Sequence, residues 1–394
     1  MWSHVFFAAP HRVFFAGGLG QALLALLFWG IELTGRQAGW MLPWPVPATW
    51  LHAGMMLYGI FPWFILGFLM TALPKWMAHP PLKRSEYLPS FLLMAVGTVA
   101  CWLGLGWPGL LMPATLAVAL GLLLAVAVLL RVTFRGQGGR VHALLVLATL
   151  ALGALGLGLH GLALGRMEAA LQGVAVILGI WCFLLPLFYI VLHRMLPFFT
   201  AAVLPGFEAW RPHGVLYLML LCLAGHGVLQ LLGLPTWPVD LGAAGLAWYC
   251  LVRWGFLQAL RVPMLAMLHG GWLWACLGLS LYALQSLLAA AGVAWGGLAP
   301  LHVLGLGCFA SILLGMGTRV TRGHSGRPIV GDRWGWRCFL ILQPAVLLRL
   351  LGEFQPLGGN VNLLAVLVAG AAFLVWGLVH GPMYFRPRPD GMEG

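Results

Sequence analysis

Residues 109–130 read GLLMPATLAVALGLLLAVAVLL, a run with no charged side chain that Arg131 ends. An α-helix rises about 1.5 Å per residue, so about 20 apolar residues cross the ~30 Å hydrocarbon core of a bilayer. The stretch therefore predicts a transmembrane helix, and the rest of the chain repeats its pattern.

Eleven further apolar runs flank this one, separated by proline- and glycine-rich turns. With it, they cover residues 13–34, 48–73, 88–106, 109–130, 141–164, 169–192, 214–234, 239–260, 264–292, 298–318, 336–354 and 361–380. The chain is 62% hydrophobic and only 8% charged, whereas soluble domains carry about 25% charged residues. We predict an all-α polytopic protein with about twelve transmembrane helices, forming a single integral membrane domain over residues 1–394.

The basic residues predict the orientation. With the N-terminus inside, the inner segments hold 18 of the 21 Lys and Arg residues, and the outer segments hold only Arg36, Arg166 and Arg349. Positive charge collects on the cytoplasmic side of membrane proteins. Both termini are therefore expected in the cytoplasm.

Charge also restricts the function. The net charge of +12 comes from basic residues scattered between the apolar runs, and membrane topology explains this distribution. We therefore expect the lipid bilayer as a partner, and no nucleic acid. All nine acidic residues lie at helix ends, in loops or in the tail. A cation-coupled transporter normally needs a carboxylate near the membrane midplane, so this pattern argues against that class.

Histidines are the main polar residues of the predicted spans, and the topology sorts them into two layers. The outer layer holds His52, His160, His226 and His302, and the inner layer holds His142, His193, His269 and His324. Neutral imidazole is a common metal ligand and a standard axial ligand of haem iron. Each histidine could instead cap a helix or bond to a neighbouring helix.

His52 and His302 best fit a haem held by two histidines, because they lie at equal depth on different predicted helices. Small residues follow both, with Gly54 after His52 and Gly305 after His302, and these would let a flat macrocycle approach the backbone. His269 has similar small neighbours, although helix packing explains them equally well. Met55 near His52 could suit Cu(I), but packing is the simpler interpretation.

The most polar segment is residues 318–328, TRVTRGHSGRP, predicted as the loop after the tenth span. A basic cytoplasmic loop explains its arginines but not the Gly-His-Ser-Gly turn among them. Such a segment could hold an anion, for example a haem propionate.

Four separated stretches resemble the NnrS family, bacterial membrane proteins associated with nitric oxide metabolism and described as containing haem and copper. They are LHAGMMLYGIFPWFILGFLMTALPKW (51–76), HRMLPFFTAAVLPG (193–206), LHVLGLGCFASILLGMGTRVTRGHSGRP (301–328) and FRPRPDG (385–391). The resemblance implies a bacterial cytoplasmic membrane protein with haem, here expected as haem b.

The resemblance supports particular positions as site residues. These are His52, Arg194, His302, Arg319, His324 and Arg327, with His160 and His269 matching more loosely. The family usually reads His-Ala-His-Glu where this chain has Gly54 and Met55 at the third and fourth positions. This departure puts copper or another second metal in doubt. His193 stands where the family commonly has glycine.

Three functions follow as expectations. The favoured one is a haem protein with His52 and His302 as axial ligands. It would bind nitric oxide and act in nitric oxide metabolism, in denitrification or in resistance to nitrosative stress. A quinol-dependent nitric oxide reductase would need a quinol site as electron donor and a binuclear centre. His193, His269 and His324 are candidate ligands of its second haem or metal. A metal-free transporter is the third. Catalytic residues, and whether the chain is an enzyme at all, stay open.

Overall fold

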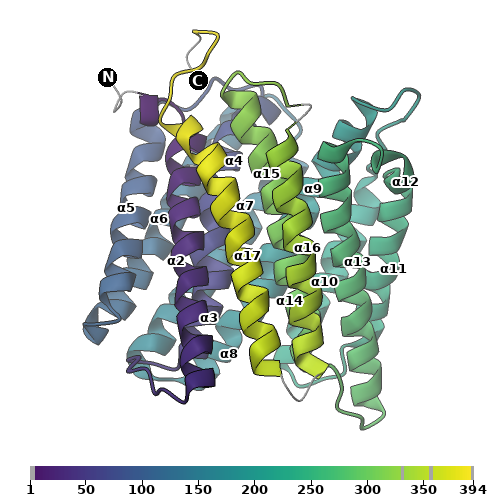
Figure 1. The fold of residues 1–394 in the computed structure, drawn as a ribbon. Coiled ribbons are helices and arrows are strands. Elements are labelled where there is room, and N and C mark those ends of the chain that lie inside the picture. Colours follow the sequence, from purple (N-terminus) through teal and green to yellow (C-terminus); the bar gives the residue numbers. More distant parts are fainter. Residues whose placement is uncertain (1–4, 330–331, 355–357, 392–394) are drawn as a thin grey trace.

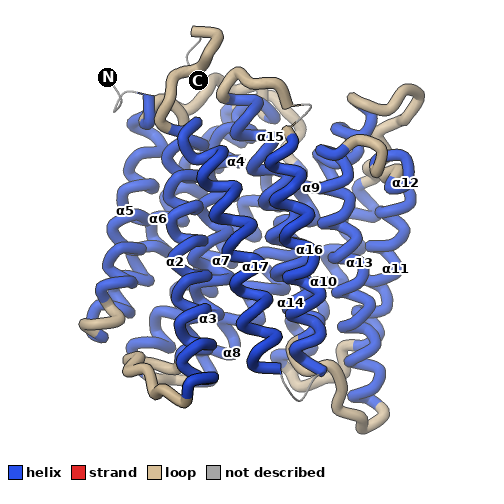
Figure 2. The backbone as a smooth tube through the Cα atoms, viewed as in Figure 1, coloured by secondary structure: helices blue, strands red, loops and turns tan. Residues whose placement is uncertain are grey.

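The chain forms one bundle of roughly parallel and antiparallel helices, seen in Figure 1 and Figure 2. The computed structural model describes residues 5–329, 332–354 and 358–391, and within these it contains helices and loops without any strand. The predicted all-α fold is confirmed. The N- and C-terminal ends lie at the same end of the bundle (Figure 1), as an even number of crossings requires.

Each of the twelve predicted runs contains a helix. In chain order they are α2 (Pro10–Ala38), α3–η1–α4 (Ala48–Gly54, Met55–Ile60, Phe61–Trp76), α5 (Arg84–Leu103), η2–α6 (Pro108–Leu110, Leu111–Arg135), α7 (Val141–Arg166), α8–η3–α9 (Ala169–Ile177, Leu178–Leu184, Leu185–Ala201), α10 (His213–Leu231), α11 (Trp237–Arg253), α13 (Pro263–Ala290), α14–η4–α15 (Ala299–His302, Val303–Phe309, Ala310–His324), α16 (Arg333–Phe354) and α17 (Gly358–His380). The short helices α12 (Phe256–Ala259) and η5 (Gly381–Tyr384) complete the described part of the chain.

Ten of these helices are long and apolar enough to cross a membrane. The other two predicted spans are α11, which has 17 residues, and α16, which carries Arg337, Arg349 and Glu353. The structure is thus compatible with about twelve crossings, with α11 and α16 as the two that length and composition do not establish.

Three predicted boundaries are wrong. Helix α9 continues through His193 to Ala201, and α15 continues to His324, so the segment predicted as a loop from residue 318 is helical for its first seven residues. Helix α11 ends early, at Arg253, because Gly255 adopts a left-handed conformation with φ 80°.

The second, sixth and tenth spans each contain a π-helical segment: η1, η3 and η4. These are also the most enclosed spans, each 72% buried over its most apolar window. Pro62 follows η1 and Pro186 follows η3, and a proline lacks the N–H that would bond to the carbonyl four residues earlier. π-helical turns widen a helix locally and are frequent at functional sites.

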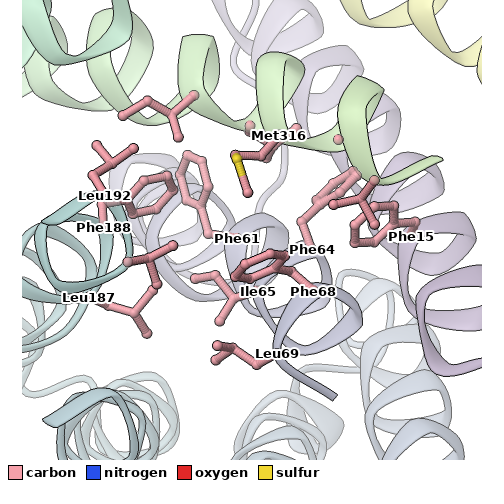
Figure 3. Close-up of a pocket in the computed structure, with 15 residues that line it drawn as sticks. Phe15, Phe61, Phe64, Ile65, Phe68, Leu69, Leu187, Phe188, Leu192 and Met316 are labelled. Atoms are coloured by element: carbon pink, nitrogen blue, oxygen red, sulfur yellow. The ribbon is translucent and has the colours of Figure 1, made fainter. Parts of the chain in front are cut away.

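Phenylalanines join these three spans at the centre. Phe61, Phe188 and Phe309 come one from each span, and every pair is in ring contact, with centroids 4.8 to 5.8 Å apart. Beside them lies a cavity of about 60 Å³ between α4, α9 and α15 (Figure 3). All 15 residues that line it are apolar, and the sulfur of Met316 is the one side-chain heteroatom among them.

Candidate functional site

His52 lies in α3, in the half of the bundle away from the termini (Figure 1). Its ring stacks on Trp29 of α2, with centroids 3.9 Å apart and planes within 19°. The Nδ1 atom is buried and has no hydrogen-bond partner among the described residues. A buried polar nitrogen without a partner is costly, so this imidazole is held in place with unused bonding capacity.

His302 is the last residue of α14, directly before η4. Its Nδ1 lies 2.9 Å from the backbone carbonyl of Leu298. Because a carbonyl only accepts, Nδ1 carries the proton and Nε2 keeps its lone pair. This is the arrangement that orients a metal-binding histidine. One turn on, a side chain added at Gly305 would meet no atom within 4 Å.

His52 and His302 interact electrostatically. They are near enough for the charge of His302 to act on His52, and Arg36 and Arg349 act on it as well. Arg36 is paired with Glu32 and Arg349 with Glu353, each at 2.7 Å. Two of the three outer basic residues of the chain therefore lie beside this histidine pair.

These residues fit a haem in their chemistry. Two neutral imidazoles with available nitrogens suit axial ligation. The arginines suit the carboxylates of the propionates. The open space at Gly305 suits a flat ring.

His160, in α7, occupies the space beside Gly54. A Cβ added to Gly54 would lie 2.7 Å from Cε1 of the imidazole and nearer still to Nε2. The ring is buried, and its Nδ1 donates to Oε1 of Gln172 at 2.7 Å, so the lone pair of Nε2 faces Gly54. The ring of His160 thus fills the space that a side chain at position 54 would need.

A cavity of about 70 Å³ adjoins His160, and Met55 and Cys101 also line it. Imidazole, thioether and thiol are together the donors that a soft metal ion such as Cu(I) prefers. Gln172, which orients His160, is absent from the sequence prediction. The sequence could have indicated this contact, because Gln172 lies just beyond the short α7–α8 turn, at about the depth of His160.

His193 has no free nitrogen. Its Nδ1 lies 3.1 Å from Nε2 of His142, and its Nε2 donates to the carbonyl of Pro212 at 3.2 Å. The Pro212 bond places the proton on Nε2, so His142 donates to His193. A metal could bind His193 only by displacing one of these partners.

His269 is fully buried in α13 and pairs with a different helix. The hydroxyl of Thr200 donates to Leu196, so it accepts from Nε2–H of His269, with Nε2 and Oγ1 3.2 Å apart. Its Nδ1 keeps a lone pair and has no partner among the described residues. His324 packs instead against His11, with ring centroids 4.9 Å apart. The three inner histidines of the predicted second centre therefore have three separate sets of partners.

The predicted arginines lie at the end of the bundle near the termini, away from α3 and α14 (Figure 1). Arg194 stacks over Trp76 and Arg319 over Phe199, with the guanidinium 4.8 and 3.8 Å from the ring centroids. Arg327 bonds to the carbonyl of Ser325. These arginines are therefore separate from His52 and His302, and the role of the 318–328 segment in holding an anion stays a prediction.

Sequence reasoning missed a buried His226–Asp240 pair, whose carboxylate also accepts from Thr236, while Trp181 of η3 stacks on the imidazole. The short turn between α10 and α11 could have suggested it. Within the described ranges, no three His, Cys, Asp or Glu side chains are grouped closely enough to hold a metal ion.

Comparison with known proteins gives one family. The family described as NnrS protein matches residues 5–388. No curated protein matches the chain.

Proposed function

The chain belongs to the NnrS family over nearly its whole length, and on this premise we propose that it is a haem protein of the bacterial cytoplasmic membrane that acts in nitric oxide metabolism or in resistance to nitrosative stress. The observation that supports the proposal is that Nδ1 of His52 has no partner among the described residues, Nε2 of His302 keeps its lone pair, and the charge of His302 acts on His52.

In this proposal the protein holds its ligands ready before the haem arrives. The carbonyl of Leu298 fixes the proton of His302 on Nδ1 and leaves Nε2 as the ligand atom. Stacking on Trp29 fixes the plane of His52. A haem held by these two histidines would supply one-electron chemistry and affinity for nitric oxide.

The surroundings support the same proposal. Arg36 and Arg349 would pair with the two propionates in place of, or in addition to, their glutamates. The apolar central cavity suits a small uncharged gas, because an apolar cavity excludes water and admits apolar atoms and molecules. For a second metal such as copper, we propose His160 as the ligand, oriented by Gln172.

The test is the absorbance spectrum of the detergent-purified protein, oxidised and dithionite-reduced, with metal analysis of the same sample. We expect a sharp reduced α-band that His52→Ala and His302→Ala each abolish. His79→Ala, which removes a histidine from the surface between α4 and α5, should keep it. A colourless, iron-free protein that is folded by circular dichroism would refute the haem proposal.

Nitric oxide is tested separately, by titrating the reduced protein. Shifted Soret and visible bands are expected, and unchanged bands would refute this part alone. Consumption of nitric oxide with a quinol donor would extend the proposal to an enzyme.

A further inference from the structure

Six basic side chains gather where the chain termini meet the bundle. This basic cluster comes from four separate segments: His11 and Arg12 in the first turn of α2, Lys75 near the end of α4, His324 and Arg327 at and after the end of α15, and Arg388 in the C-terminal segment. Three of these segments contain residues that sequence analysis singled out, and the proposed function uses none of them.

Several contacts hold the cluster together. The imidazoles of His11 and His324 lie 4.9 Å apart. Arg388 reaches the carbonyl of His324 at 3.5 Å. The charges of Lys75 and Arg12 act on both histidines, and those of Arg327 and Arg388 act on Arg12.

Two members are buried and incompletely bonded. His11 and Arg12 are each 2% exposed. Arg12 donates from Nη1 to the carbonyls of Met383, Tyr384 and Arg386 at 2.9 to 3.3 Å. Its Nε, and Nδ1 of His11, are buried without a hydrogen-bond partner among the described residues. His11 faces the cluster, since its ring packs against His324.

Among the described residues of this region, positive charge exceeds negative charge. Four members carry a full charge: Arg12, Arg327, Arg388 and Lys75. The carboxylate that pairs within the described part of the cluster is that of Asp390, which is bonded to Arg388. Helix α2 adds its N-terminal dipole, with no acidic residue in its first turn.

Membrane topology does not account for this arrangement. The positive-inside rule requires basic residues on the cytoplasmic side, and exposed ones satisfy it fully. It gives no reason to bury Arg12 and His11 among other cations, where an unpaired charge is costly. The carbonyls bonded to Arg12 account for Nη1 of its guanidinium. They leave Nε without a hydrogen-bond partner among the described residues.

We infer that the basic cluster binds a phosphoryl group at the cytoplasmic face of the membrane. Guanidinium, ammonium and imidazole groups around a helix N-terminus match the several oxygens and the charge of a phosphate. The phosphate could be free, or it could belong to the headgroup of an anionic phospholipid, because basic pockets between transmembrane helices bind such headgroups.

The experiment measures the thermal midpoint of the full chain in a neutral detergent with chloride buffer at constant ionic strength. Inorganic phosphate is titrated in one arm, and phosphatidylglycerol replaces phosphatidylcholine in mixed micelles in the other. Lys75→Gln and Arg327→Gln remove cluster charges with few structural contacts, since the hydrogen bond of Arg327 is to the carbonyl of Ser325, two residues away at 3.3 Å. Arg135→Gln, an exposed residue at the end of α6, removes the same charge outside the cluster.

We expect at least one of the two probes to raise the midpoint of the wild type and of Arg135→Gln, since a ligand that binds the folded state stabilises it. Each cluster variant should bind that probe about tenfold more weakly. A response to phosphate identifies a free anion, and a response to phosphatidylglycerol alone identifies a lipid headgroup. No response to either probe, or equal weakening by Arg135→Gln, would overturn the inference. Because the readout is stability, absence of haem leaves the result unaffected.

Discussion

Gly54→Ala tests whether the imidazole of His160 fills the space beside position 54. Gly54 is helical, with φ −62° and ψ −46°, so alanine suits its backbone and would by itself stabilise the helix by about 0.5–1 kcal/mol. The obstacle is His160, whose Cε1 and Cδ2 would lie 2.7 and 2.9 Å from the new Cβ.

Ordinary contact begins at 3.4 Å, so the ring must retreat by about 1 Å. It is buried and bonded to Gln172 at 2.7 Å. Overpacking costs about 1–3 kcal/mol, and a weakened hydrogen bond costs about 1 kcal/mol. We therefore expect Gly54→Ala to lower the free energy of unfolding by about 2–3 kcal/mol.

The assay is reversible unfolding in mixed detergent micelles, followed by circular dichroism, for a double-mutant cycle. In the His160→Ala background the obstacle is gone, so Gly54→Ala should become neutral or stabilising by about 0.5–1 kcal/mol. Gly173→Ala, in α8 with no atom within 4 Å of the added carbon, is the control and should be neutral or stabilising in both backgrounds. If Gly54→Ala cost the same with and without the imidazole, His160 would not fill this space.

Three further predictions concern stability and order. Phe309→Ala removes the ring that joins the tenth span to the second and sixth, and should cost about 3–5 kcal/mol in the same unfolding assay; a loss below ~1 kcal/mol would contradict the central packing. Arg12→Gln removes the donors that hold the C-terminal segment, so limited chymotrypsin digestion should cleave after Tyr384 and Phe385 faster than in wild type, and equal rates would show that this segment is held by other contacts. Burial opposes ionisation of Asp332, but the hydrogen bond from His380 and nearby positive charge outweigh it, and its pKa lies below the ordinary 3.8. A lowered pKa stabilises the fold above the ordinary value and loses this effect as pH falls through the folded-state pKa, so wild type should lose stability below about pH 4 relative to Asp332→Asn, and parallel pH profiles would contradict the pairing.

The sequence by itself determined the class of fold and the depth of its polar residues. Hydrophobic length predicted helices in every one of the twelve runs, and charge asymmetry assigned their direction. Depth follows directly, because each helical residue advances about 1.5 Å along a span whose ends the sequence marks. His52 and His302 could therefore be paired by depth, and the charge of His302 acts on His52.

Only the tertiary structure decided which neighbour each side chain meets. Which way a helix faces depends on packing against the other spans, and the sequence of one span does not contain it. His193, His269 and His324 share a layer, yet they face His142, Thr200 and His11.

The same reason hid the features formed by several spans. The contact of His160 with Gly54 depends on how α7 packs beside α3. The basic cluster joins segments more than 300 residues apart. The depth of a residue in the membrane follows from its position along its own span. The direction in which it faces around the helix axis is decided by packing against other helices.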